Sequence, residues 1–256
     1  MFIAVDIGNT RTTCGIFQRE LLAAIINFPT LRGEVKSISD EAKKQFALYQ
    51  DVHEVCIASV VPKATYATSD ALNEIFGDIE IRVLSHDDIP IDCSYKNPDE
   101  VGTDRLLGSV AAYTKYGDAE KKPIIVIDLG TATVFDCIDK NGTYLGGAIA
   151  LGIESGAKHL STIAAQLPPV PLEFPKRVLG KTTEDSMQSG ILFGAVSMVE
   201  GMVKRLTDEV FPKQRPIIVA TGGLAALIIE HAPFITHYEP NLVLDGIRIS
   251  HDQKKK

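Results

Sequence analysis

IAVDIGNT at residues 3–10 recurs as IVIDLGTA at residues 125–132, 122 positions further along the chain. Each copy is an apolar run that delivers an Asp and is followed by a turn containing Gly. A second apolar run follows each turn, so each copy predicts a β-hairpin with a carboxylate beside its turn. A repeated hairpin predicts a duplicated fold. We expect Asp6 and Asp128 to face one cleft, an arrangement that suits a phosphate ligand carrying a cation.

Composition places the chain among ordinary globular proteins. Its 256 residues are 45% hydrophobic and 23% charged, which allows one large core or two modest ones. The formal net charge of −7 argues against nucleic acid or an anionic membrane as the main partner, because such partners bind clustered Lys and Arg. The three lysines at residues 254–256 are interpreted as a solvated tail.

The cysteines and histidines show no metal or redox pattern. No C-x-x-C pair occurs among the four cysteines and no H-E-x-x-H among the six histidines, so neither zinc nor a redox motif is indicated. Cys14 and Cys137 fall in the second strands of the two hairpins, where we expect small buried hydrophobic side chains. With no leader pattern and no apolar run of membrane-spanning length, the sequence predicts a soluble cytoplasmic protein.

Strands and helices alternate along the chain, which predicts an α/β fold. Beyond the hairpins, strands are expected at residues 21–28, 55–61, 79–84 and 216–220. Helices are expected at residues 39–50, 64–76, 102–116, 155–166, 182–206 and 224–231. Because no flexible linker is seen, we expect two similar halves, residues 1–116 and 117–256, that pack intimately. Glycines 190, 194 and 201 on the longest helical pattern indicate close packing against another element.

The first hairpin turn offers the donors that a nucleotide phosphate needs. Gly8 permits a close backbone approach, Asn9 and Thr10 add side-chain donors, and Asp6 would hold Mg²⁺ through water. Taken alone, this motif is explained about equally well by an ordinary hairpin turn.

The second hairpin turn repeats this construction, with Thr131 placed to donate to phosphate and Asp128 available to a cation. A structural turn inherited by duplication is the alternative. Duplication gives no reason to keep Asp and Gly beside new hydroxyl groups, so we favour a functional role. Thr221-Gly222-Gly223 adds a turn that is compatible with a nucleotide at the following helix N-terminus, although any strand-to-helix turn can use two glycines.

GTDR at residues 102–105 is the candidate for the part of the site where the reaction takes place. The dipole of a helix N-terminus keeps a carboxylate ionised, so Asp104 could accept a hydroxyl proton. Arg105 could hold an acid group of a substrate. The structural alternative is that Asp104 caps the helix and Arg105 lies on the surface. Thr183 could be either the N-cap of its helix or a ligand contact. Tyr95 could be either an aromatic side chain that fills space in its loop or a ligand contact.

These ordered motifs resemble those of the type III pantothenate kinase family, in the acetate and sugar kinase/actin superfamily, over nearly the whole chain. The matching segments are DIGNT at 6–10, ASVVP at 58–62, YKNP at 95–98, GTDR at 102–105, IDLGTATVFD at 127–136, GGAIALGI at 146–153, TTEDSMQSG at 182–190 and ATGGLA at 220–225. Two positions depart from the usual pattern. Leu151 stands where the family commonly has Pro, and Val134 replaces a hydroxyl residue.

The resemblance implies a pair of ribonuclease H-like, actin-like α/β halves with ATP in the cleft between them. It also implies the activity: transfer of the γ-phosphoryl group of ATP to pantothenate, which gives 4′-phosphopantothenate as the first step of coenzyme A synthesis. Family members are homodimers whose substrate pocket borders the dimer interface, which would give the long helix over 182–206 a partner.

The resemblance also assigns roles to single residues. It implies that Asp104 is the proton acceptor and that Asp128 is the ligand of a required monovalent cation, K⁺ or NH₄⁺. ATP with Mg²⁺ would be contacted by Asp6, Ile7, Gly8, Asn9, Thr10, Arg11, Thr12, Thr13 and Thr131. Pantothenate would be contacted by Tyr95, Gly102, Thr103, Asp104, Arg105 and Thr183.

Two other functions stay open for the same residues. A regulatory relative would bind nucleotide without phosphorylating pantothenate, but GTDR with Tyr95 and Thr183 argues against it, because a pure binding module needs no acceptor site. A related kinase would act on another hydroxy acid or on a sugar. Arg105 fits a carboxylated substrate better than a neutral sugar.

Overall fold

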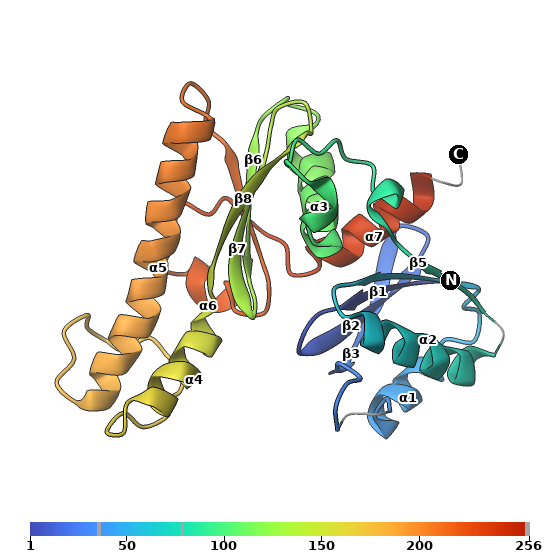
Figure 1. Ribbon diagram of the computed structural model, residues 1–256, viewed down its shortest axis with the longest axis horizontal. Helices are drawn as coiled ribbons and strands as arrows, with labels where there is room; N and C mark the ends of the chain where they lie inside the picture. The colour runs from blue at the N-terminus through green and yellow to red at the C-terminus, as the bar shows by residue number, and fades with distance from the viewer. Residues whose placement is uncertain (35–36, 78, 254–256) are drawn as a thin grey trace. The chain divides into compact units, whose positions relative to one another are not determined.

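The structure is a computed structural model that describes residues 1–34, 37–77 and 79–253 (Figure 1). Within these residues the chain forms two compact units, Met1–Ala111 together with the C-terminal helix, and Ala112–Asn241, each with one five-stranded sheet. The duplicated α/β fold expected from the sequence is confirmed. The expected division into residues 1–116 and 117–256 stays a prediction, and the lysines at 254–256 lie outside the described residues.

The first sheet has the strand order β3-β2-β1-β4-β5. The first hairpin consists of β1 (Phe2–Ile7) and β2 (Arg11–Gln18), which run antiparallel, and β3 (Leu21–Pro29) pairs with β2. On the other side of β1, β4 (Glu54–Ser59) and then β5 (Glu80–Val83) are added in parallel. Parallel strands need a crossover connection, which α2 (Pro62–Phe76) supplies between β4 and β5.

Two helices cover one face of this sheet (Figure 1). Alternate side chains of β1, including Ile3 and Val5, point to this face and pack with Phe46 of α1 (Asp40–Phe46) and Leu72 of α2. Burying such a side chain contributes about 1.5–3 kcal/mol. α1 begins where the side chain of Ser39 accepts a hydrogen bond from the backbone N–H of the third residue along, as an N-cap does.

The second sheet repeats the first. Its order is β10-β9-β6-β7-β8, which from the opposite edge is the same sequence of three antiparallel strands followed by two parallel ones. The strands are β6 (Ile124–Leu129), β7 (Ala132–Ile138), β8 (Tyr144–Leu151), β9 (Ile217–Thr221) and β10 (His237–Tyr238). The topology therefore supports the duplication inferred from the repeated phrase.

The long helix α5 (Thr183–Val210) packs on the second unit's core through one face only. Leu192 and Val199 are fully buried there, together with Phe135 of β7. Gly190 and Gly194 are exposed on the opposite face, and apart from the adjacent backbone of α5 itself no described atom lies within 4 Å of the place a Cβ would take at either. The close packing expected at these two glycines is therefore not made within the described part of this chain. α4 (Ile153–Ile163) and α6 (Ala225–Ile229) complete the unit.

Three elements of the two sheets and their covering helices were not expected from the sequence: the short strand β10, the strand β8 and the helix α7. The glycine-rich stretch expected after the second hairpin is the edge strand β8, in which Gly146 has φ +127° beside a register shift. The chain also ends in the helix α7 (Leu242–Gln253). Gly246 lets this helix approach the first unit's α3 (Thr103–Ala112) closely, since a Cβ there would overlap the backbone of Leu107.

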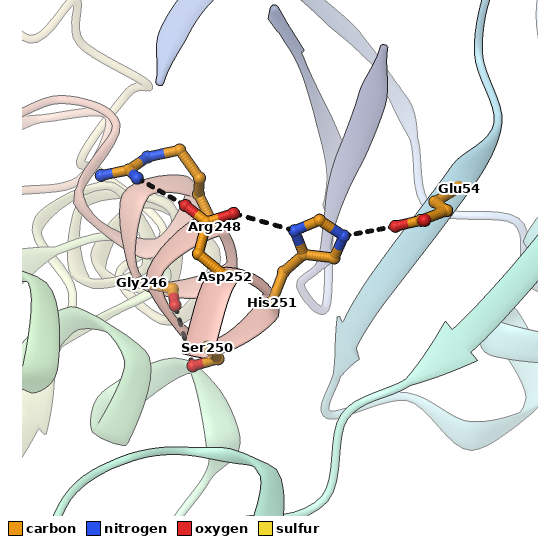
Figure 2. Close-up of polar contacts among 6 residues, drawn as sticks. All are labelled: Glu54, Gly246, Arg248, Ser250, His251 and Asp252. Atoms are coloured by element: carbon orange, nitrogen blue, oxygen red, sulfur yellow. Dashed lines mark hydrogen bonds and ion pairs between the residues drawn. The ribbon is translucent and has the colours of Figure 1, made fainter. Parts of the chain in front are cut away.

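α7 is joined to the first sheet by His251 (Figure 2). Its Nε2 lies 2.5 Å from Oε2 of Glu54 on β4, and its Nδ1 lies 3.1 Å from Oδ1 of Asp252. The imidazole also stacks on the ring of Phe2, with 4.1 Å between ring centroids. Arg248 pairs with the same Asp252 at 2.9 Å. The contacts of His251 with Glu54 and Phe2 fix the last helix on the face of the sheet opposite α1 and α2, while the two contacts of Asp252 lie within the helix.

The cysteines are free thiols. Cys14 and Cys137 are buried, as the sequence predicts, and burial raises the pKa of both thiols, that of Cys137 to about 12. Both therefore stay protonated and unreactive at neutral pH. Among the residues that the structure describes, no helix has the length and apolar character needed to cross a membrane.

Candidate functional site

The predicted site residues fall on both units, and each group is described within its own unit. The first unit holds Asp6, Ile7, Gly8, Asn9, Thr10, Arg11, Thr12, Thr13, Tyr95, Gly102, Thr103, Asp104 and Arg105. The second unit holds Asp128, Thr131 and Thr183.

The first hairpin turn is tightly closed. Gly8 N donates to the carbonyl of Arg11 at 3.1 Å, and a Cβ at Gly8 would stand 3.3 Å from the same oxygen, closer than most side chains tolerate. Asn9, Thr10 and Arg11 are exposed. Asp6 is the next-to-last residue of the first strand, lies opposite Thr13 and is partly exposed. The turn thus presents backbone and side-chain donors to solvent beside a carboxylate.

Not every residue of this motif can offer its side chain to a ligand. Ile7 and Thr12 form a cross-strand pair whose side chains are fully buried, so a ligand could reach these two residues only through their backbones. Thr30, which no sequence pattern singled out, donates from Oγ1 to the carbonyl of Gly8 at 2.7 Å. It supports the turn from the buried side.

The second hairpin turn has a similar frame. Gly130 N donates to the carbonyl of Ala132 at 3.0 Å, and Thr131 is exposed at the tip. The start of α4 packs on this tip: a Cβ at Gly152 would overlap the carbonyls of residues 130 and 131, and Ser155 Oγ donates to Thr131 O at 2.9 Å. The glycine-rich stretch therefore supports the turn as well as forming β8.

Asp128 lies in a cradle made by the Thr221-Gly222-Gly223 turn. β6 and β9 are parallel, with Asp128 opposite Thr221. Gly222 has φ +92°, and a Cβ there would overlap Oδ1 of Asp128. The structure thus brings the second and third glycine-containing motifs together around one carboxylate. Glycine is required at position 222 both for its backbone conformation and for this space.

The two departures from the family pattern lie beside these features. Val134 is the cross-strand partner of Asp128, so an apolar side chain flanks the carboxylate on β7. Leu151 ends β8 opposite Ala132 and is 64% exposed. Neither replaces a residue with a predicted role.

Asp104 stands in the first turn of α3. Its Oδ1 accepts a hydrogen bond from the backbone N–H of Arg105 at 2.9 Å, and a Cβ at Gly102 would overlap the same oxygen. Burial raises the pKa of Asp104, while the N–H and the guanidinium of Arg105 act in the opposite direction. The sequence predicted a carboxylate held ionised by the helix N-terminus. In the structure the loss of water around the side chain is the larger effect.

The remaining predicted residues differ in exposure. Thr103 is buried, and its Oγ1 has no hydrogen-bond partner among the described residues. Tyr95 is half-buried in the irregular loop that precedes α3. Thr183 is exposed, and the N-cap of α5 is its neighbour Thr182, whose hydroxyl accepts from Asp185 N at 3.1 Å. The capping role considered for Thr183 is therefore filled by Thr182.

Thr183 also lines an open hollow of about 720 Å³ in the second unit. Apolar side chains of α4, of α5 and of the segment between them form part of the wall, and residues just before and within the first turn of α5 form the rest. The lining residues are Leu160, Leu167, Gly180, Lys181, Thr182, Thr183, Ser186, Met187, Gly190 and Ile191.

A cation at Asp6 or at Asp128 would need phosphate oxygens as further ligands. No group of three or more His, Cys, Asp or Glu side chains in the described part of the chain could hold a metal ion by itself. Mg²⁺ bound with a nucleotide needs only one or two carboxylates, because phosphate and water supply its other ligands. Asp6 offers one such carboxylate at a donor-rich turn, and Asp128 offers another in a glycine cradle. Both donor sets fit this kind of site.

The family model described as type III pantothenate kinase matches residues 2–205. The type III pantothenate kinase 1 of Symbiobacterium thermophilum is 37% identical over 263 residues, which cover 98% of this chain and 96% of that protein. The type III pantothenate kinase of Moorella thermoacetica is 37% identical over 258 residues, which cover 99% of both.

Solved structures show the same fold at lower identity. A Campylobacter jejuni protein, provisionally named as a Baf family transcriptional activator, has a TM-score of 0.64 at 18% identity and covers 99% of this chain and 98% of its own. A Listeria monocytogenes protein, provisionally named as an N-acetylmannosamine kinase, has a TM-score of 0.53 at 13% identity, with coverages of 100% and 99%. These two likenesses concern the fold alone, which is that of the sugar kinases and actin-like ATPases. The match of the family model over residues 2–205, together with that of relatives along nearly the whole sequence, shows more: this chain belongs to the type III pantothenate kinase family.

Proposed function

We propose that this protein transfers the γ-phosphoryl group of ATP to the primary hydroxyl of pantothenate. The product is 4′-phosphopantothenate, and the reaction is the first step of coenzyme A synthesis, which we place in the cytoplasm. The observation that carries this proposal is the 37% identity to type III pantothenate kinases over nearly the full length of both chains.

In this proposal the two hairpin turns hold ATP. Residues 6–13 contact the triphosphate with the exposed donors of the first turn, and Thr131 contributes from the second. Asp6 holds Mg²⁺ through water, and Asp128 binds K⁺ or NH₄⁺ in the cradle that Gly222 leaves open. When bound, these cations offset the negative charge of the phosphates. The protein's own work is then mainly to position the reacting groups.

Asp104 accepts the proton of the attacking hydroxyl in this proposal. The pantothenate oxygen forms a bond to the γ-phosphorus, the bond to ADP breaks, and the hydroxyl proton passes to the carboxylate. A raised pKa suits this task, because a carboxylate with a higher pKa is a stronger base. The contacts to pantothenate come from Tyr95, Gly102, Thr103, Arg105 and Thr183.

We further propose that the protein acts as a homodimer. The second unit exposes several large apolar side chains, which mark association surfaces when they gather. They include Ile149, Leu151, Ile163, Val178 and Leu179. The exposed glycines of α5 allow a second helix to approach, and Thr183 at the start of α5 would then lie near the interface.

One coupled assay tests the function and separates it from its alternatives. ATP consumption is measured with pantothenate, with and without K⁺ or NH₄⁺. We expect pantothenate-dependent turnover that rises with the monovalent cation. A protein that binds ATP but consumes none with pantothenate under any cation would instead be a regulatory relative. Turnover with a neutral sugar and none with pantothenate would show a different kinase.

A further inference from the structure

His86 contacts the backbone that leads into α3. It begins a short 3₁₀ turn, His86–Asp88, soon after β5, fifteen residues before Val101. Its Nε2 lies 2.6 Å from the carbonyl oxygen of Val101. This contact joins the two ends of the irregular loop that carries Tyr95.

The direction of this hydrogen bond follows from its partners. A backbone carbonyl can only accept, so Nε2 of His86 carries the hydrogen and donates it. The other ring nitrogen, Nδ1, lies 4.0 Å from a carboxylate oxygen of Asp99, whose side chain is 98% exposed. An ion pair this exposed contributes little. The contact with Val101 is therefore the one through which His86 acts on the loop.

The fixed carbonyl belongs to the peptide that positions Gly102. Val101 is buried, and its carbonyl shares a rigid peptide plane with the nitrogen of Gly102. The carbonyl of Gly102 then starts α3 by accepting from Arg105 N at 3.1 Å. Asp104 Oδ1 folds back over Gly102 into the space that a Cβ would fill. The carboxylate thus rests on a backbone segment held in place by His86.

We propose that His86 is a positioning residue for Asp104 and sets the place and direction of its carboxylate at the start of α3. This inference rests on the proposed function, in which Asp104 accepts the proton of the substrate hydroxyl. Proton transfer needs the two oxygens within about 2.6–3.2 Å. A displacement of about 1 Å can lower a rate by about 100-fold. Loss of the hydrogen bond to Val101 therefore lowers kcat and leaves ATP binding intact.

The test compares side chains that do and do not reproduce the Nε2 donor. His86→Leu removes the donor and keeps bulk, and we expect kcat to fall about tenfold or more, with the KM for ATP unchanged within about twofold. The amide nitrogen of Gln takes the place of Nε2, so His86→Gln retains most of kcat. The amide of Asn matches Nδ1 instead, so His86→Asn behaves like His86→Leu. Asp99→Asn, which removes the exposed partner, is the matched control and keeps wild-type kcat.

The outcomes separate this inference from the proposed function. Wild-type turnover with pantothenate tests the function itself, and its absence overturns both. Wild-type turnover together with an unchanged kcat in His86→Leu overturns the positioning role alone. If His86→Leu fails to fold, the comparison of Gln with Asn decides. Equal kcat values for those two amides overturn the role, because a structural defect would not distinguish the positions of their donor nitrogens.

Discussion

At the scale of single residues, Asp104 is a buried carboxylate with the proposed role of a base. Burial raises the pKa of its carboxyl above the ordinary value of 3.8, and only the ionised form can accept a proton. We expect kcat/KM to fall on acidification at a pH above that ordinary value. Asp104→Asn should lower kcat by about 10²–10⁴-fold, with little change in the KM for ATP. Steady-state kinetics across pH measure both effects, and wild-type turnover in the variant would show that another group is the base.

The same burial predicts that Asp104 lowers stability at neutral pH. The pKa of Asp104 is higher in the folded state than in the unfolded state. Its contribution to stability is therefore complete at a pH below the unfolded-state pKa. This contribution is lost as the pH rises through the folded-state pKa. Asp104→Asn keeps an oxygen that can accept from Arg105 N but removes the charge. We expect a higher free energy of unfolding at pH 7, by about 1.4 kcal/mol for each tenfold difference in proton affinity. Urea titrations should show this gain shrinking toward pH 4, and an equal gain at both pH values would contradict the explanation.

Gly222 provides a test of the Asp128 cradle. Gly222→Ala puts a Cβ at φ +92° and against Asp128 Oδ1, so we expect a loss of about 1–3 kcal/mol in the free energy of unfolding and weaker activation by K⁺. Gly223→Ala is the matched control. No described atom lies within 4 Å of a Cβ there, and its φ is outside the left-handed range, so an effect below about 0.5 kcal/mol is expected. Urea unfolding and a K⁺ titration of turnover compare the two variants, and equal effects would mean that the cradle has no special role.

At the scale of elements, periodicity and turn residues predicted most of the fold. Both hairpins form because an apolar run, a Gly turn and a second apolar run leave few other arrangements. β8 was missed because Gly146 and Gly147 have low strand propensity, and only pairing with β7 makes the segment a strand. α7 was missed because Gly246 interrupts a helical pattern. Glycine is required at position 246 because α7 contacts Leu107 there, and no local sequence pattern shows this contact.

The candidate site shows the same division between local and tertiary signals. Its glycine turns and GTDR are local motifs, so the sequence identified them. Thr30, His86 and Ser155 were missed because each acts through a hydrogen bond to a backbone carbonyl in a distant segment. A lone Thr, Ser or His in a loop has no pattern that marks such a contact. The raised pKa of Asp104 also depends on tertiary burial, which outweighs the local effect of the helix N-terminus.

α7 offers a prediction about a single element. His251 links Glu54 of β4 to this helix and stacks on Phe2, so His251→Leu leaves the half-buried Glu54 carboxylate without this partner. We expect a loss of about 1–3 kcal/mol in the free energy of unfolding, measured by urea denaturation. The exposed His53→Leu is the control and should change it by less than about 0.5 kcal/mol. A double variant with Glu54→Gln should lose less than the sum of the single losses, and full additivity would mean that the pair does not interact.

At the scale of the whole molecule, the two units share one strand order but differ in the chemistry proposed for them. Asp6 and Asp128 are the next-to-last residues of equivalent strands, β1 and β6, and each is assigned to a cation in the proposal. Asp104 lies on α3, outside the repeated phrase, and is assigned to the proton. The duplication therefore predicts the frame that is proposed to hold phosphate, while the proposed reacting group comes from a segment that the repeated phrase does not include.

The exposed face of α5 carries the last prediction, which concerns the proposed homodimer. Helical geometry puts Gly190, Gly194 and Gly201 on one side and the buried Leu192 and Val199 on the other. If a second copy packs on this side, Gly194→Arg inserts a long charged side chain into the interface and should give monomers. Because the position is exposed in the single chain and an added Cβ would meet no described atom beyond the adjacent backbone of α5, the subunit itself should stay folded. Light scattering and circular dichroism measure these two properties.

A control and an activity measurement complete this test. Glu209→Arg places the same side chain at an exposed position of α5, about 80° around the helix from the middle of the glycine face, and should leave the dimer intact. Thr183 lies at the start of α5 and lines the hollow there. Loss of the dimer should therefore raise the KM for pantothenate more than the KM for ATP. If Gly194→Arg is monomeric but has wild-type KM values, the pantothenate pocket does not depend on the interface. If Gly194→Arg is still dimeric, the interface lies elsewhere.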